Sequence, residues 1–270
     1  FENVGHSRPW MKALTVGISG GYLSEGDTIT LTFGDTSGGS PGFKMQTFVE
    51  SGFEFKVLVD ACAVGHYVPI LDKPAISIVP GDPINWRAAV STLRRPGESF
   101  QLGIKAEDEW GNPSDLVEAN LRIEASLPVT NLPETASFTK GQKSLQFEKL
   151  SVAEEGELRI TIFDADSDAP LCEAGPLIIE AGAYGGYWGD LHGQSGESIG
   201  ATNSREDFDF ARDLAFLDVI SHQANDFQVN NAFWAYLNEL TASYHQDNRF
   251  VTFPGYEWSG NTSVGGDRNI

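Results

Sequence analysis

Side chains that bind metals well follow three short apolar segments in the last third of the sequence. Asp190, His192 and Gln194 follow the first segment, His222 closes the second, and Glu257 follows the third. Imidazole and carboxylate groups together suit zinc, manganese or iron. These residues therefore indicate a site for divalent metal ions.

Two amphipathic segments separate the three apolar ones, so the order of elements is β-α-β-α-β. Residues 204–215 and Asn231–Tyr244 place apolar side chains at helical spacing, and Ser204 is the predicted N-cap of the first helix. This order calls for parallel strands joined by right-handed crossovers. The carboxyl ends of parallel strands share one edge, where α/β enzymes place their active sites. We therefore expect the three groups of polar side chains to converge.

Each residue also has an ordinary structural explanation. Asp190 could accept a local hydrogen bond in a turn, and His222 could be a core histidine bonded to a backbone carbonyl. Glu257 could form an ion pair with Arg249 or Arg268. A shared sheet edge, however, explains all three positions together.

The part of the chain before these segments is typical of β-structure. Polar and apolar residues alternate with a period of two in five stretches, which are Asp27–Gly34, Phe53–Ala61, Ser99–Asp108, Glu118–Ser126 and Gly156–Asp166. Turn-forming clusters separate them, and short strands at this spacing favour an antiparallel sandwich. The segment PGESFQLGIKAEDEWGNPSD resembles bacterial immunoglobulin-like modules.

These patterns predict three domains. We expect a β-rich N-terminal segment over residues 1–75, an immunoglobulin-like β-sandwich over residues 76–183, and an α/β region over residues 184–270. The predicted fold class is therefore multidomain, with an all-β part followed by an α/β part.

Charge excludes some classes of partner. The chain has 270 residues and a net charge of −20, with 38 acidic against 18 basic side chains. Such a field repels phosphate backbones and anionic membranes, so neither nucleic acid nor membrane is an expected partner. No apolar run reaches the ~18 residues of a transmembrane helix. We expect a soluble protein; the compartment stays open, with the cytoplasm slightly favoured over the periplasm or secretion.

Three segments in combination resemble the start of the polymerase and histidinol phosphatase (PHP) superfamily. They are YWGDLHGQS, FARDLAFLDVISHQANDFQ and FVTFPGYEWSGNTSVGGDRN, which lie within residues 187–270. More narrowly, they look like an uncharacterised branch of it. The resemblance implies a distorted (β/α)7 barrel that holds a cluster of metal ions and hydrolyses phosphate esters.

By this resemblance, His192 is the first histidine of the family's His–x–His motif, His222 closes the second strand, and Glu257 is the bridging carboxylate. Gln194 stands where the superfamily has its second histidine, and Asp267 stands where many relatives carry another. The resemblance implies two divalent ions of manganese, zinc or iron. Each histidine would fix one ion.

The predicted function is a metal-dependent phosphoesterase that acts on a small molecule. His192, His222 and Glu257 would be its catalytic residues, and Asp190 would be a ligand or would orient one. The alternatives are hydrolysis of a non-phosphate ester, lactone or amide at the same cluster, and a non-catalytic β-sandwich binding protein with a decayed barrel. The family's later ligands are not in this sequence, so we expect a second chain or a C-terminal portion to complete the barrel.

Overall fold

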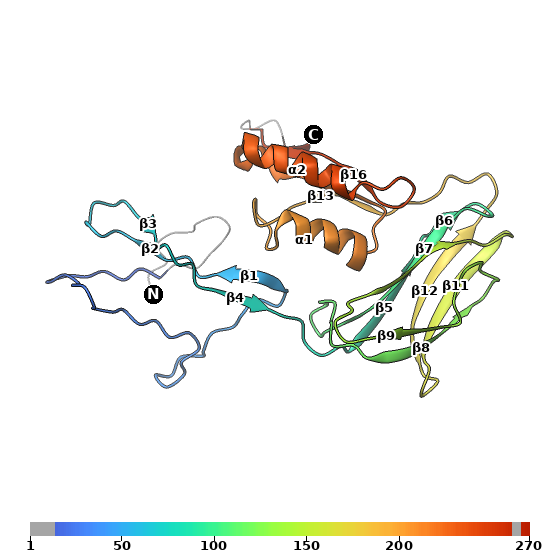
Figure 1. The fold of residues 1–270 in the computed structure, drawn as a ribbon, viewed down its shortest axis with the longest axis horizontal. Coiled ribbons are helices and arrows are strands. Elements are labelled where there is room, and N and C mark those ends of the chain that lie inside the picture. The colour runs from blue at the N-terminus through green and yellow to red at the C-terminus, as the bar shows by residue number, and fades with distance from the viewer. Residues whose placement is uncertain (1–13, 261–265) are drawn as a thin grey trace. The chain divides into compact units, whose positions relative to one another are not determined.

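The computed structural model describes residues 14–260 and 266–270 (Figure 1). The chain divides into two compact units, residues 1–47 and 48–270, and each is described by itself. Strands hold 36% of the residues and helices only 11%, so the chain is mostly β. This composition already differs from that of an α/β barrel, in which strands and helices alternate throughout.

The elements follow one another in this order along the chain. The strands are β1 Glu50–Glu54, β2 Leu58–Val59, β3 Val68–Pro69, β4 Ala75–Ile78, β5 Asn85–Val90, β6 Leu93–Arg94, β7 Phe100–Glu107, β8 Ala119–Ala125, β9 Thr135–Phe138, β10 Leu145–Leu150, β11 Gly156–Asp164, β12 Pro170–Ile179, β13 Gly189–Gly193, β14 Val219–His222, β15 Ala224–Asn225, β16 Val251–Phe253, β17 Tyr256–Trp258 and β18 Arg268–Asn269. The helices are α1 Ser204–Asp209, the π-helix η1 Phe210–Leu214, the 3-10 helix η2 Asp226–Gln228, and α2 Asn231–Tyr244.

The first unit forms neither helix nor strand in its described part, residues 14–47. The prediction of a strand over Asp27–Gly34 is therefore wrong. Alternation marks a strand only where a neighbouring strand accepts the backbone hydrogen bonds, and none pairs with this segment. Its apolar side chains stay exposed, including Ile29, Leu31 and Phe33.

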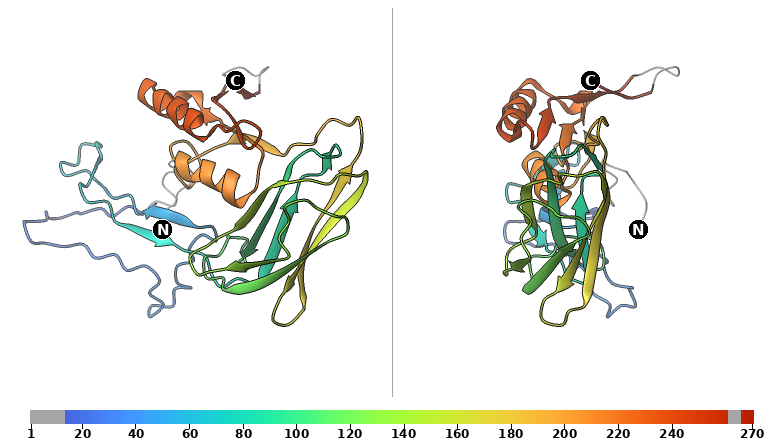
Figure 2. Two further views of the ribbon diagram at one scale, coloured as in Figure 1. Left: turned by 45° about the vertical axis from the view of Figure 1, so that its right-hand side comes forward. Right: turned by 90° about the vertical axis from the view of Figure 1, so that its right-hand side faces the viewer.

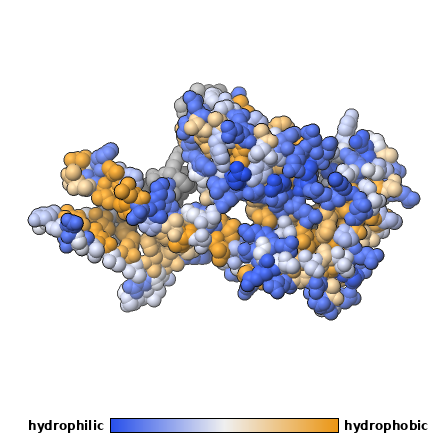
Figure 3. All heavy atoms as spheres, in the orientation of Figure 1, coloured by the Kyte–Doolittle hydropathy of each residue, from blue (hydrophilic) through white to orange (hydrophobic). Residues whose placement is uncertain are grey.

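The second unit begins with two short antiparallel pairs, β1 with β4 and β2 with β3. Apolar side chains are exposed here as well, among them Leu58, Val68 and Leu71. Figure 3 shows orange, apolar spheres over the part of the chain before β5. The prediction of a strand over Phe53–Ala61 is only partly confirmed, because β1 ends at Glu54 and β2 has two residues.

A β-sandwich follows, which we define as residues 83–180. One sheet has the order β10-β7-β5 and the other β6-β12-β11-β8-β9, and Figure 2 shows the two layers in its right-hand view. In β11 the side chains of Leu158, Ile160 and Ile162 are buried while their neighbours are not, which is the predicted period of two. The predictions for Ser99–Asp108, Glu118–Ser126 and Gly156–Asp166 are confirmed as β7, β8 and β11, with the last two residues of the third lying in a turn.

The α/β region, which we define as residues 186–270, contains two small sheets. β13, β14 and β16 pair in parallel, and β15, β17 and β18 form a second sheet in which β15 and β17 are parallel. Pro254 and Gly255 separate β16 from β17, so the third apolar segment of the sequence forms two short strands instead of one. Proline has no N–H to give to a ladder, which accounts for the break.

The predicted fold class, an all-β part followed by the start of a distorted (β/α)7 barrel, is wrong. The described residues contain no closed barrel, and their two small sheets are open. A β-α-β-α-β pattern specifies local crossovers, and an open parallel sheet satisfies these as well as a barrel does. Barrel closure depends on strand number and stagger, which no local pattern in the sequence encodes.

The helices of the α/β region cover one core. α2 has the predicted bounds, and α1 begins one residue earlier than predicted, because Asn203 rather than Ser204 is the N-cap. Asn203 Oδ1 accepts the backbone N–H of Glu206, whose carboxylate accepts the N–H of Asn203, which is a capping box. Six residues form the buried core, namely Phe208, Ala211, Ile220, Leu240, Tyr244 and Phe250. No helix in the described part of the chain is long and apolar enough to cross a membrane.

A close contact joins the sandwich to the α/β region. The ring of Phe216 lies on Gly103 of β7, where a Cβ atom would come within 2.4 Å of the ring. Phe216 has a φ of +57°, an uncommon conformation for a bulky residue. Ser144 and Gln146 of the sandwich also donate hydrogen bonds to the carbonyl oxygen of Asp213, at 2.8 and 3.1 Å.

Candidate functional site

The polar residues of the α/β region occupy paired positions on neighbouring strands. Gly193 at the end of β13 lies opposite His222 at the end of β14, and Asn225 of β15 lies opposite Glu257 of β17. The antiparallel strand β18 then places Asn269 opposite Glu257. Polar side chains from β13, β15, β17 and β18, and from the segment after β13, therefore lie close to one another.

Glu257 is the centre of this site. It is 7% exposed, and its Oε2 atom accepts hydrogen bonds from Gln194 Nε2 at 2.9 Å and from Asn225 Nδ2 at 2.5 Å. Two amide donors on one oxygen stabilise a buried carboxylate. The other oxygen, Oε1, lies 3.7 Å from His192 Nε2.

Asn269 fixes the tautomer of His192. The Asn269 amide nitrogen donates to the carbonyl oxygen of Leu191 at 2.6 Å, so its Oδ1 atom lies at 2.8 Å from His192 Nδ1. An amide oxygen only accepts, so His192 Nδ1 must carry a proton. In the neutral imidazole the lone pair then belongs to Nε2, the atom nearest to Glu257 Oε1. Two electron-rich atoms at this separation are stabilised by a cation or a proton between them.

The distance between these two atoms suits a shared metal ion. Ligand atoms at about 2.1 Å from one ion can be no more than about 4.2 Å apart, and His192 Nε2 and Glu257 Oε1 are within that limit at 3.7 Å. A histidine that donates its other N–H to a fixed acceptor is the usual arrangement at metal sites. The pair of side chains therefore fits one divalent cation.

His222 lies in a separate, buried environment. It is 1% exposed, its Nε2 atom is 2.7 Å from Ser195 Oγ, and that hydroxyl is 3.1 Å from Ser204 Oγ. Burial lowers the pKa of His222 from 6.5 to about 4, although the charge of Glu197 opposes the shift. His222 is therefore neutral at pH 7. Among the described residues its Nδ1 atom has no hydrogen-bond partner.

A buried carboxyl group lies beside the site. Burial, together with the charges of Asp190 and Glu197, raises the pKa of Asp207 from 3.8 to about 7. Its Oδ2 atom has no hydrogen-bond partner among the described residues. Burial disfavours the charged form of a carboxyl group, and nearby negative charges disfavour it as well.

The structure brings some of the predicted residues together and separates others. Gln194 and His192 both contact Glu257, whereas His222 contacts Ser195. Asp190 is exposed, and its Oδ1 atom accepts the backbone N–H of His192 at 2.8 Å, as in an ordinary turn.

Asp267 is exposed and immediately precedes β18. Neither predicted ion pair of Glu257 with an arginine occurs, because Arg249 pairs with Glu148 and Arg268 has no ion pair in the described chain. Within residues 14–260 and 266–270, no three His, Cys, Asp or Glu side chains gather closely enough to hold an ion.

The sequence indicates Asn225 as a polar residue just beyond His222, but it does not indicate Asn269 or Ser195 as residues of the site. Asn225 and Asn269 are the polar neighbours of Glu257 and His192, and Ser195 is the partner of His222. Asn269 follows Asp267 by two positions, a spacing that places both on one face of a strand, so alternation could have indicated it. No sequence signal marks Ser195, because its role depends on a contact between β14 and the loop after β13.

Comparisons with known proteins place the chain in no family. No family model matches the chain. An uncharacterised protein of Chlamydia pneumoniae is 23% identical over 264 residues, which cover 92% of this chain and 41% of that protein. The chain thus spans about two fifths of the length of this curated relative.

A solved structure of FdeC, described as a broadly conserved Escherichia coli adhesin, is 21% identical and has a TM-score of 0.28. The match covers 49% of this chain and 41% of that one. A similarity at this TM-score supports no conclusion about fold or function.

Proposed function

We propose that the α/β region is a metal-dependent hydrolase site centred on His192 and Glu257. The observation that carries this proposal is the 3.7 Å separation of His192 Nε2 from Glu257 Oε1, with the remaining polar atoms of both side chains already occupied. Each side chain is thereby left with one free ligand atom, and the two free atoms lie side by side. The resemblance of these segments to the PHP superfamily supports the same proposal.

The chain's own residues hold the two ligand atoms in place. Asn269 keeps the proton of His192 on Nδ1, while Gln194 and Asn225 hold the Glu257 carboxylate in its orientation. Gln194 is itself held, because its Oε1 atom accepts the Ser198 hydroxyl at 3.0 Å. A divalent ion held by His192 and Glu257 would lower the pKa of a bound water and neutralise the charge of an ester substrate.

Phosphate esters are the proposed substrates, on the resemblance alone. Manganese, zinc and iron are the proposed metals, since imidazole and carboxylate ligands suit all three. Hydrolysis of a carboxylic ester, lactone or amide at the same centre is the second candidate. Both reactions need the same two metal ligands, so only assays with different substrates distinguish the two candidate functions.

Metal binding tests the centre directly. The full chain is loaded with Mn²⁺ or Zn²⁺, dialysed and assayed for metal content. We expect Glu257→Gln and His192→Gln to lower the affinity for the ion by about tenfold or more, since each removes one ligand atom. Glu107→Gln is the matched control, because Glu107 is a mostly buried carboxylate of the sandwich that pairs with Lys105. An ion held equally well by all variants would place it elsewhere and refute the site.

Turnover separates the hydrolase from a bare metal site. Hydrolysis of p-nitrophenyl phosphate and of p-nitrophenyl acetate is measured on the loaded proteins. We expect phosphate ester hydrolysis to fall by about a hundredfold or more in Glu257→Gln, with thermal stability nearly unchanged. Preference for the acetate would favour the second candidate. Metal binding without turnover of either ester would contradict a hydrolase.

A further inference from the structure

Strand β5 is an uncovered edge of the sandwich. It ends the sheet β10-β7-β5 and, among the described strands, pairs only with β7, in unbroken register from Asn85 to Val90. Alternate residues of such an edge direct their backbone N–H and C=O groups away from the sheet. Proteins usually protect an edge with a lysine, a proline or a β-bulge, and β5 has none of these. The edge of β5 can therefore accept a further strand.

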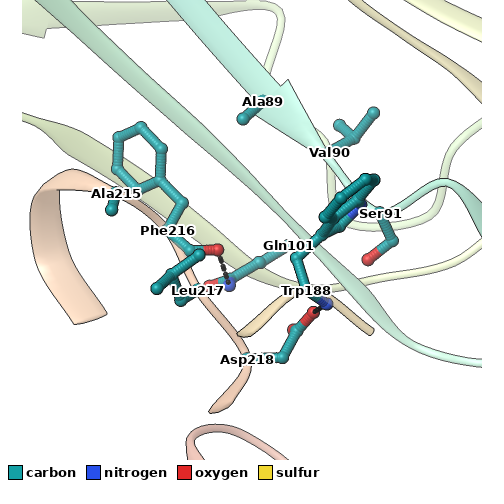
Figure 4. A pocket seen from close by; sticks show the side chains of 9 residues that line it. All are labelled: Ala89, Val90, Ser91, Gln101, Trp188, Ala215, Phe216, Leu217 and Asp218. Carbon is teal, nitrogen blue, oxygen red and sulfur yellow. Dashed lines mark hydrogen bonds between the residues drawn. The ribbon is translucent and has the colours of Figure 1, made fainter. Parts of the chain in front are cut away.

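A cavity adjoins this edge on the outer face of the sheet. Ala89 of β5 pairs with Gly103 of β7, and the ring of Phe216 lies on Gly103. Beside them is a cavity of about 300 Å³, which Ala89, Phe216 and Trp188 help to line (Figure 4). We call it the outer cavity. A side chain that leaves an added strand on this face of the sheet would enter it.

A groove adjoins the same edge on the inner face of the sheet. Ala88 and Val90 alternate with Ala89 and therefore point to the opposite side, toward β12. Together with Pro176 and Ile178 of β12 they help to line a groove of about 460 Å³. None of the described side chains that line the groove is charged. An added strand would thus meet space on both faces, and the groove favours apolar side chains.

The segment Asp27–Gly34 has the composition of a strand. Ile29 and Leu31 alternate with threonines, and β-branched residues favour strands. Residues 28–32 pair with no described strand, and the side chains of Ile29 and Leu31 are 55% and 53% exposed. Residues 28–33 carry no charge, although the whole chain has a net charge of −20. Two copies of so acidic a chain repel each other least where a neutral segment makes the contact.

We propose that the edge of β5 binds residues 27–34 of a second copy of this chain as an added strand. The backbone of the added strand bonds to the free N–H and C=O groups of β5, Ile29 and Leu31 enter the groove, and the threonines face the outer cavity. No residue of this contact belongs to the candidate metal centre, so the inference does not depend on the proposed hydrolase function.

Self-association of the full chain tests the proposal. Sedimentation velocity measures the weight-average mass from about 1 µM to about 300 µM protein, and we expect it to rise with a Kd of about 100 µM or tighter. Amide hydrogen exchange of residues 28–32 and of β5 should slow over the same range, because their free N–H groups become bonded. A chain that stays monomeric at every concentration would overturn the proposal.

Two lysine variants locate the contact. Leu31→Lys places a charge on the donated strand, and Ala89→Lys places one on the accepting edge; both positions are exposed, so the fold is expected to be kept. We expect each variant to weaken self-association by about tenfold or more, since a lysine blocks an edge. Ile18→Lys and Leu116→Lys are the matched controls, because both residues are exposed and lie outside the segment, the groove and the outer cavity. Equal losses in the controls would refute the inference.

A mixture of the two variants shows whether the two positions are partners. The Leu31→Lys chain keeps a free β5 edge, and the Ala89→Lys chain keeps an unchanged strand segment. We therefore expect the mixture to form a one-to-one complex that grows no larger, because the first chain cannot donate a strand and the second cannot accept one. A mixture that associates no more than the separate variants would refute the proposed pairing.

Discussion

The sandwich and the α/β region treat buried polar groups in opposite ways. In the sandwich, the buried Asp108 carboxylate accepts N–H bonds from Gly81, Trp110 and Asn112 and a further one from the Asn112 side chain, at 2.8 to 3.0 Å. In the α/β region, the buried Asp207 Oδ2 atom has no partner among the described residues.

The contrast extends beyond these two carboxylates. Seven buried side-chain atoms in the described part of the chain lack a partner, and six belong to the α/β region, on Asp207, His222, Gln223, Asn225, Gln228 and Arg249. The seventh is on Gln101 of the sandwich. Buried polar groups without partners are rare in proteins and cost stability. Where stability alone is selected such groups are removed, so their number in the α/β region agrees with the site proposed there.

The largest expected effects are losses of unfolding free energy when a leucine in either hydrophobic core is truncated. Leu102 of the sandwich and Leu240 of α2 are both buried, but the sandwich core has sixteen buried residues and the other has six. We expect Leu102→Ala to lower the free energy of unfolding by about 4 kcal/mol and Leu240→Ala by about 3 kcal/mol, because a cavity in a larger core collapses less. Urea denaturation measures both. A greater loss for Leu240→Ala would reverse the comparison.

Asp207 should make the protein less stable at neutral pH. Because folding raises its pKa from 3.8 to about 7, its stabilising contribution is complete below pH 3.8 and is lost as the pH rises through 7. Asp207→Asn stays uncharged, so we expect it to be more stable than the wild type by about 3 kcal/mol at pH 8 and equally stable at pH 4.

Thermal unfolding from pH 4 to pH 8, in the presence of a chelator, measures the difference in stability between Asp207→Asn and the wild type. The exposed residue Asp72 supplies the control variant Asp72→Asn, because solvent screens charge at an exposed position. A constant difference between Asp207→Asn and the wild type across the range would show that burial does not penalise the charge.

The contribution of Asp108 to folding stability should depend on pH in the opposite direction to that of Asp207, and it should be smaller. Burial opposes its ionisation, but hydrogen bonds from Gly81, Asn112 and Trp110 outweigh burial and lower its pKa from 3.8 to about 2. Its contribution is therefore present above pH 3.8 and is lost as the pH falls through 2. We expect Asp108→Asn to be less stable by about 2 kcal/mol at pH 7 and to match the wild type near pH 2. Acid titration of the unfolding free energy measures this.

Local structure could be predicted where one face of an element is buried. The bounds of α2 and the strands β7, β8 and β11 follow from their apolar periodicity, since each rests on a core. The same alternation in Asp27–Gly34 predicts a strand that does not form, because it finds no partner to pair with. Periodicity in the sequence indicates which face of an element could be buried. Whether a neighbouring strand or helix covers that face depends on the tertiary fold.

The candidate site was predictable in its residue types and less so in its contacts. His192 and Glu257 follow from the strand ends and lie 3.7 Å apart. The tautomer of His192 depends on Asn269, which lies 77 positions away in the sequence. Likewise, nothing near His222 in the sequence shows that it bonds to Ser195. Long-range side-chain contacts of this kind are set by packing between elements.

The contact between Gly103 and Phe216 bears on how such a protein can evolve. A sandwich domain acquired from another gene would carry a side chain at position 103 in most cases, and even a methyl group there would meet the Phe216 ring. Gly103 and Phe216 lie in different domains and in different parts of the gene. If either domain were exchanged for a homologous one, the new residue at position 103 or 216 would have to fit the residue that remained. We therefore expect the two parts to be inherited as one module, with changes at position 103 occurring only alongside a smaller residue at position 216.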